Sequence, residues 1–316
     1  MRNVLRSLVP PALWALASRL KERVFPPKDH LAEYLKRPVP WSIGYHYHKA
    51  GYLSAQLGRI DILDCFAGGG RLPDGFGIGL DERCVEYPWA IARLRGSAGN
   101  LLDAGSVFNF DYILNCPSLE PFKITIVNLH PETNCYHGRA VNYLYEDLRS
   151  LPLADKWFEQ IVCISTLEHI GFDNELFSSQ FEAGSPSGPL ASNFSDADYK
   201  QALLELWRVL KPGGVLLLSV PFGVREVSST QQVFDLTELN ALLAVLPDAA
   251  KRVDFFRYRG EGWQLSDADD CKDAQYVDWV TLPRDAKPKD FPVQPDGASA
   301  SRAVACIEMR KSERKI

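Results

Sequence analysis

The chain has 316 residues, of which 46% are hydrophobic and 24% charged, as in ordinary soluble globular proteins. Its net charge of -5 argues against nucleic acid as the main partner, because phosphate binding normally requires a basic excess. The seven cysteines show neither a CxxC pair nor zinc-like spacing, which predicts reduced thiols, a cytoplasmic location and no metal site.

The N-terminal segment resembles a signal peptide at first, but Pro10 and Pro11 interrupt its apolar run. Residues 13–24 then carry apolar side chains on one stripe and basic ones elsewhere, which predicts an amphipathic helix. Such a helix packs on the domain or makes peripheral contact with a membrane surface. Further on, His46 and His48 lie two residues apart in an expected strand, but no third ligand is close enough to indicate a metal.

Residues 62–70 read as a strand and a glycine-rich turn, and residues 78–82 read as a following strand. Parallel neighbours need a crossover of about a dozen residues, and the short segment 71–77 contains helix-breaking proline and glycine. We therefore interpret this region as a loop-rich lead-in to a helix over 81–94, which has acidic residues in its first turn.

From residue 100 onward, strand and helix patterns alternate, which is typical of a parallel sheet. The expected strands are 101–104, 123–128, 140–145, 158–165, 215–220, 252–257 and 302–309. Helices are expected over 112–114, 198–210 and 236–246. This pattern predicts an α/β, Rossmann-like, doubly wound seven-stranded sheet with an N-terminal helical extension. We expect a helical and aromatic extension over 1–97 and a ligand-binding domain over 98–316, with insertions at 173–198 and 260–300.

Four stretches of this region carry a family resemblance: Leu101 to Gly105, Val127 to Glu132, Glu146 to Glu159, and Arg208 to Leu216 with its Lys-Pro-Gly-Gly turn. In this order they resemble the class I S-adenosylmethionine-dependent methyltransferases of the small-molecule and glycan type (methyltransferase-11-like). The resemblance covers residues 98–224 well and the last strands more loosely. Residues 79–89 are also similar to a helix that precedes the cofactor loop in a bacterial subgroup linked to surface glycans.

The resemblance implies a binding site for S-adenosylmethionine. The turn at Gly105 and Ser106 would let backbone approach the amino-acid part, and Asp103 would orient that turn or reach the ammonium through water. Asn128 would contact the ribose hydroxyls. Asp147 would accept a hydrogen bond from the adenine amino group, while Leu148 covers the ring.

Two departures from the family pattern concern this site. Residues 106, 107 and 109 are not the usual glycines, and Asn128 stands where the family usually has an acid for the ribose. An amide lacks the charge-assisted strength of a carboxylate. The consequence is weaker cofactor affinity, a replacement acid such as Glu132, or lost activity.

We expect O-methylation of a small-molecule or sugar-containing, glycan-type acceptor. His169 is the first candidate for the general base that a hydroxyl acceptor needs, and Glu168 is the second. His169 bonded only to backbone is the competing interpretation. Two other readings stay open. The first is that the protein is a nicotinamide-dependent oxidoreductase, which is disfavoured because no GxGxxG motif follows the strand that begins at residue 101. The second is that it is a catalytically silent scaffold, which the glycine-poor turn supports.

Overall fold

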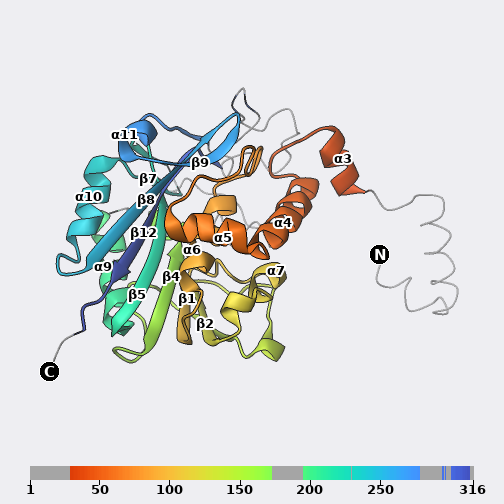
Figure 1. The fold of residues 1–316 in the computed structure, drawn as a ribbon. Coiled ribbons are helices and arrows are strands. Elements are labelled where there is room, and N and C mark those ends of the chain that lie inside the picture. The colour runs from red at the N-terminus through yellow and green to blue at the C-terminus, as the bar shows by residue number, and fades with distance from the viewer. Residues whose placement is uncertain are drawn as a thin grey trace, which may run out of the picture.

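The computed structural model describes residues 29–172, 195–228, 230–277, 294, 296 and 300–313. The amphipathic helix expected over 13–24 and most of the insertion at 173–198 lie outside these described residues. Figure 1 shows a central twisted sheet with helices on both of its faces. None of the described helices is long and apolar enough to cross a membrane.

The sheet has eight strands in the order β3-β2-β1-β4-β5-β12-β8-β9. The bounds are β1 Gly99–Ala104, β2 Phe122–Asn128, β3 Asn142–Tyr145, β4 Phe158–Ile164, β5 Leu210–Pro221, β8 Ala250–Arg259, β9 Gly262–Ser266 and β12 Ala303–Arg310. The first five strands of that order are parallel, and β12 runs antiparallel between β5 and β8. All seven expected strands are present, so the predicted Rossmann-like fold is confirmed. β9 adds an eighth strand from the start of the segment expected to be an insertion.

The strand order reverses between β1 and β4, and a doubly wound sheet binds its ligands outside the carboxyl ends of its strands at this point. Side chains alternate across β1, so that Leu101 faces one core and Leu102 faces the other. Both residues are fully buried, as expected for a parallel sheet covered on both faces. We therefore expect a ligand site at the carboxyl ends of β1, β2, β4 and β5.

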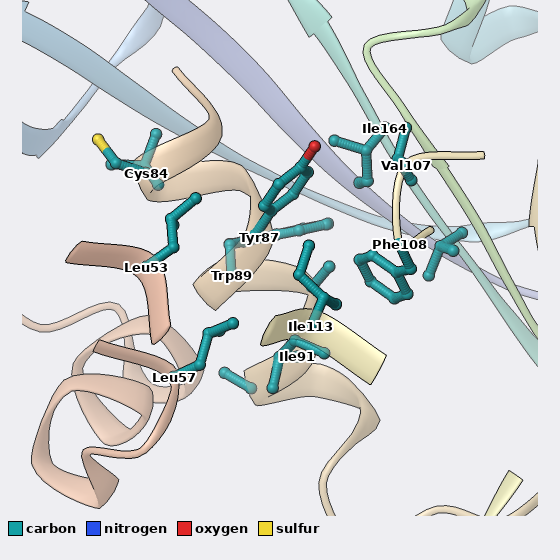
Figure 2. Close-up of a cluster of buried hydrophobic side chains, with 14 of the residues drawn as sticks. Leu53, Leu57, Cys84, Tyr87, Trp89, Ile91, Val107, Phe108, Ile113 and Ile164 are labelled. Atoms are coloured by element: carbon teal, nitrogen blue, oxygen red, sulfur yellow. The ribbon is translucent and has the colours of Figure 1, made fainter. Parts of the chain in front are cut away.

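Helices α4 Ile43–Leu57, α5 Ile60–Gly68, α6 Arg83–Leu94 and α7 Asp111–Leu114 share one core with the sheet, and α3 His30–Lys36 packs on α4. Helices α9 Asp196–Val209 and α10 Leu236–Ala244 share the other core, and α11 Ala268–Cys271 adjoins β8. Figure 2 shows the first core, where Tyr87 and Trp89 of α6 lie among side chains of α4, α7 and the turn after β1.

The remaining elements are short and lie between these helices and strands. The 3-10 helices are η1 Pro117–Leu119, η2 His137–Arg139 and η3 Leu167–His169. The short strands are β6 Glu226–Val227, β7 Gln232–Val233, β10 Tyr276–Val277 and β11 Ala300–Ser301.

Two local predictions upstream of the sheet are wrong. Residues 62–70, interpreted as a loop-rich lead-in, lie largely within α5, which buries Leu63 and Phe66 and ends at Gly69 with φ +71°. The apolar run is helical because its buried side chains share one face of a helix packed on α6. His46 and His48 lie in α4 and not in a strand, so positions two apart project from different sides. In the described ranges, no group of three or more His, Cys, Asp or Glu side chains is placed to hold a metal.

Candidate active site at the carboxyl ends of the strands

The turn after β1 is held by Asp103. Its fully buried carboxylate accepts hydrogen bonds from the backbone N–H groups of Val107 at 3.1 Å and Phe108 at 2.8 Å. Burial raises the pKa of Asp103 to about 7, although these two N–H donors act in the opposite direction. These contacts fit the role of orienting the turn, the first of the two roles expected for Asp103.

Gly105 and Ser106 form the turn itself, and both have positive φ angles, +109° and +60°. A Cβ at Gly105 would lie 2.2 Å from Oγ1 of Thr166, which follows β4, so only glycine lets the two strand ends approach this closely. The Ser106 hydroxyl is buried and makes no hydrogen bond to any described residue. A buried hydroxyl without a partner at this edge is suited to a ligand.

Glu132, in the loop after β2, supplies the carboxylate that is absent at position 128, where the chain has an asparagine. The Asn128 amide donates to Oε1 of Glu132 at 2.6 Å, and the Asn109 amide donates to Oε2 at 2.6 Å. The Asn109 carbonyl oxygen in turn accepts from the Tyr143 hydroxyl at 2.9 Å. The two asparagines that depart from the family pattern thus position one carboxylate beside the turn, and a carboxylate can accept hydrogen bonds from ribose hydroxyls.

In the loop after β3, Asp147 is engaged by Arg149. Both carboxylate oxygens accept from the guanidinium, and Oδ2 lies 3.0 Å from Nε and 2.6 Å from Nη2; this pairing lowers the pKa of Asp147. Arg149 also donates to Asp198 at the start of α9, at 2.7 Å. Leu148 is buried in the core shared with α9. The adenine contacts expected of Asp147 and Leu148 stay predictions.

A second set of polar side chains, which the sequence did not indicate, comes from the first turn of α6. Glu86 is fully buried, and its Oε1 accepts from the hydroxyls of Ser165 at 2.6 Å and Ser219 at 2.7 Å, at the ends of β4 and β5. Its Oε2 accepts from Arg83 at 2.5 Å. Glu86 thereby joins the N-terminal helices to the strand ends where the chemistry is expected.

Three more buried carboxylates surround this contact, and we call the four together the acid cluster: Asp81, Glu82, Glu86 and Glu168. Asp81 accepts from the Tyr45 hydroxyl at 2.8 Å and from Lys49 at 2.6 Å. Glu82 accepts from the backbone N–H of Ser301 at 3.2 Å, and burial raises its pKa to about 8. The sequence had indicated Asp81 and Glu82 only as acids that begin a helix.

Glu168 and His169, the two candidates for the general base, lie in η3 directly after β4. Burial raises the pKa of Glu168 to about 8, and its Oε2 makes no hydrogen bond within the described part of the chain. His169 has its Nδ1 2.9 Å from the carbonyl oxygen of Thr230, so this nitrogen carries the proton that it donates. Burial lowers the pKa of His169 to about 4.

These residues fit S-adenosylmethionine at the switch point of the sheet. The Glu132 carboxylate at the end of β2 matches the ribose hydroxyls, and the unpartnered Ser106 hydroxyl matches a polar group lying over the turn. Residues 118–218 match the family model described as a methyltransferase domain. No curated protein matches the sequence.

Solved structures that resemble the chain include the YcgJ protein of Bacillus subtilis (16% identity, 72% of this chain and 98% of that one, TM-score 0.42). Another is the N-methyltransferase NodS of Bradyrhizobium japonicum with S-adenosyl-l-homocysteine (11% identity, 89% of this chain and 96% of that one, TM-score 0.37). A third is the 1,6-didemethyltoxoflavin-N1-methyltransferase of Burkholderia thailandensis (18% identity, 86% of this chain and 92% of that one, TM-score 0.42). Likenesses of this strength say nothing about the acceptor. Residues 118–218 thus carry a methyltransferase domain, and the sheet around them has the strand order of the class I S-adenosylmethionine-dependent methyltransferases.

Proposed function

We propose that the chain methylates an oxygen atom of a small-molecule acceptor, with Glu168 as the general base. The observation that carries this proposal is the buried Glu168 carboxyl, which follows β4 at the switch point and has one oxygen without a partner among the described residues. A base should have a pKa near the working pH, and a carboxyl raised to about 8 meets this requirement better than an imidazole lowered to about 4. The proposal therefore places Glu168 before His169.

The cofactor is proposed to lie over the turn after β1. Gly105 and Ser106 would border its amino-acid part, Glu132 held by Asn128 would accept from the ribose hydroxyls, and Asp103 would keep the turn in shape. Asp147 and Leu148 are proposed for the adenine. For Asp147 to accept from the adenine amino group, its carboxylate must share or release the Arg149 guanidinium.

S-adenosylmethionine, when bound, supplies an electrophilic methyl group whose carbon–sulfur bond breaks as the acceptor oxygen attacks. The chain's own part is to hold the acceptor oxygen in line and to exclude water, which supplies much of the rate in a displacement of this kind. Glu168 takes the hydroxyl proton as the new carbon–oxygen bond forms, so that a neutral ether and a protonated carboxyl result. Deprotonated Glu168 is the active form, and activity is expected to rise with pH through about 8.

The wider assignments are proposals of the same kind. Residues 98–316 form the proposed catalytic domain, and the extension over 1–97 contributes to the site because α6 brings Glu86 to the strand ends. A glycan-type acceptor and a peripheral membrane contact through residues 13–24 rest on the sequence alone.

A labelled-methyl assay on variants tests the role of Glu168. We expect Glu168→Gln to lower the turnover rate by about 10²–10⁴ at pH 8, the range for a lost general base, and His169→Gln to lower it by less than about tenfold. S-adenosylmethionine affinity and the free energy of unfolding, measured on both variants, separate a lost base from a damaged fold. A large loss in His169→Gln with near-normal turnover in Glu168→Gln would reverse the assignment.

A further inference from the structure

The four carboxyl groups of the acid cluster, when all are ionised, carry more negative charge than the cations beside them neutralise. Lys49 pairs with Asp81 at 2.6 Å, and Arg83 pairs with Glu86 at 2.5 Å. Arg83 is shared between Glu86 and Glu82, so neither Glu82 nor Glu168 has a lysine or arginine of its own among the described residues. The nearest cationic or ionisable atoms are Nη1 of Arg83, 3.8 Å from Glu82, and Nε2 of His169, 3.9 Å from Glu168.

The two surplus carboxylates act within one electrostatic environment. Ser165, three residues before Glu168, donates to Glu86 at 2.6 Å, so the segment after β4 meets the first turn of α6. In that turn, Nη1 of Arg83 lies 2.5 Å from Glu86 and 3.8 Å from Glu82. Glu168 is 3% exposed and Glu82 7%, and water solvates neither carboxylate well. A buried carboxylate without a compensating cation is costly, and a site retains such a group where a ligand completes it.

Tyrosine side chains of α4, α6 and α7 lie near the acid cluster. The Tyr45 hydroxyl donates to Asp81, and the charges of Arg83 and Asp81 act on the hydroxyls of Tyr87 and Tyr112. Figure 2 shows Tyr87 extending from α6 toward Ile164 at the end of β4 and Val107 in the turn after β1. Carboxylates bordered by aromatic rings form an environment that attracts organic cations and repels anions.

We propose that the methyl acceptor carries a protonated amine, whose ammonium group pairs with Glu82 beside the reacting hydroxyl. This inference rests on the proposed function and names the substrate class of the same site. The ammonium supplies the positive charge that the two ion pairs leave missing, and its presence favours the ionised form of Glu168, which the transfer requires. An acceptor with a carboxylate or phosphate at the same place would face the repulsion of Glu82 and Glu168.

The charge of the methylated product tests the inference before the acceptor has been identified. The purified full-length chain is incubated with methyl-labelled S-adenosylmethionine and a small-molecule extract of the source cells, and the products are passed at pH 6 over cation and anion exchangers. We expect the labelled product on the cation exchanger, since an amine keeps its charge at this pH. Labelled product that flows through, or that binds the anion exchanger, overturns the inference and leaves methyl transfer standing. An extract that yields no labelled product overturns both.

A matched pair of variants then locates the ammonium. Glu82→Gln keeps the size of the side chain and removes its charge, and it is expected to raise the KM for the identified acceptor at least tenfold while the Kd for S-adenosylmethionine stays unchanged. Glu261→Gln, the same replacement at an exposed position in the turn between β8 and β9, is the control and leaves both constants unchanged. An unchanged KM in Glu82→Gln overturns the pairing.

Discussion

Replacement of Gly105 by alanine is expected to destabilise the fold by about 2–6 kcal/mol. The new Cβ would lie 2.2 Å from Oγ1, 2.6 Å from Cγ2 and 2.9 Å from Cβ of Thr166, all closer than carbon atoms pack. Relieving such overpacking costs about 1–3 kcal/mol. The φ angle of +109° adds about 1–3 kcal/mol, because residues with a side chain rarely adopt it. Urea unfolding at neutral pH measures the sum, and the turn that moves to relieve the contact is the proposed cofactor turn.

Two further variants separate the causes. Gly51→Ala, at an interior position of α4 with no atom within 4 Å of the new Cβ, is expected to stabilise the chain by about 0.5–1 kcal/mol. Thr166→Ala removes the two nearest atoms, so Gly105→Ala in that background should cost less than Gly105→Ala alone, with the φ cost remaining. A Gly105→Ala variant that unfolds within about 0.5 kcal/mol of the wild type would refute this geometry.

Three other predictions concern the carboxylates and their partners. The pKa of Glu168 is about 4.5 in the unfolded chain and about 8 in the folded chain. The wild type should therefore lose stability relative to Glu168→Gln as the pH rises between these values, by at most about 1.4 kcal/mol per pH unit. Equal differences in unfolding free energy at pH 5 and pH 8.5 would contradict this. Asn128→Asp places a second carboxylate against Glu132, so it should weaken S-adenosylmethionine binding, and Glu132→Gln in the same chain should restore part of the affinity measured by calorimetry. Asp103→Asn should cost about 1–3 kcal/mol in urea unfolding, because an amide offers one acceptor oxygen to the two N–H donors of the turn.

The strands of the sheet could be predicted because their signals are local. β4 and β5 are nearly continuous apolar runs, and the Lys-Pro-Gly-Gly sequence after residue 210 marks the change from helix to strand. α5 could not be recognised, because a short apolar run bounded by glycines fits a strand as well as a helix, and packing against α6 decides between them. β9 was missed because its pairing with β8 depends on a tight turn within a polar segment.

The site was predictable in part for the same reason. Gly105 and Glu132 lie near strand ends that the sequence marks, so their proximity to the switch point followed from the topology. The contact between Glu86 and Ser219 joins residues 133 positions apart, on elements whose relative placement no single segment encodes. Residues 79–89 did resemble a helix near the cofactor loop, but that resemblance assigned no role to their carboxyl groups.

Calorimetric titration of S-adenosylmethionine into the wild-type chain and Glu132→Ala tests most directly whether the cofactor binds at the β1–β2 edge. We predict saturable binding to the wild type, at least tenfold weaker binding to the variant because a charge-assisted hydrogen bond is worth about 1.5–3 kcal/mol, and no heat from NAD or NADP. Equal affinity in both chains would contradict the placement of the ribose. Heat from the nicotinamide cofactors alone would indicate an oxidoreductase, and heat from neither ligand a silent scaffold.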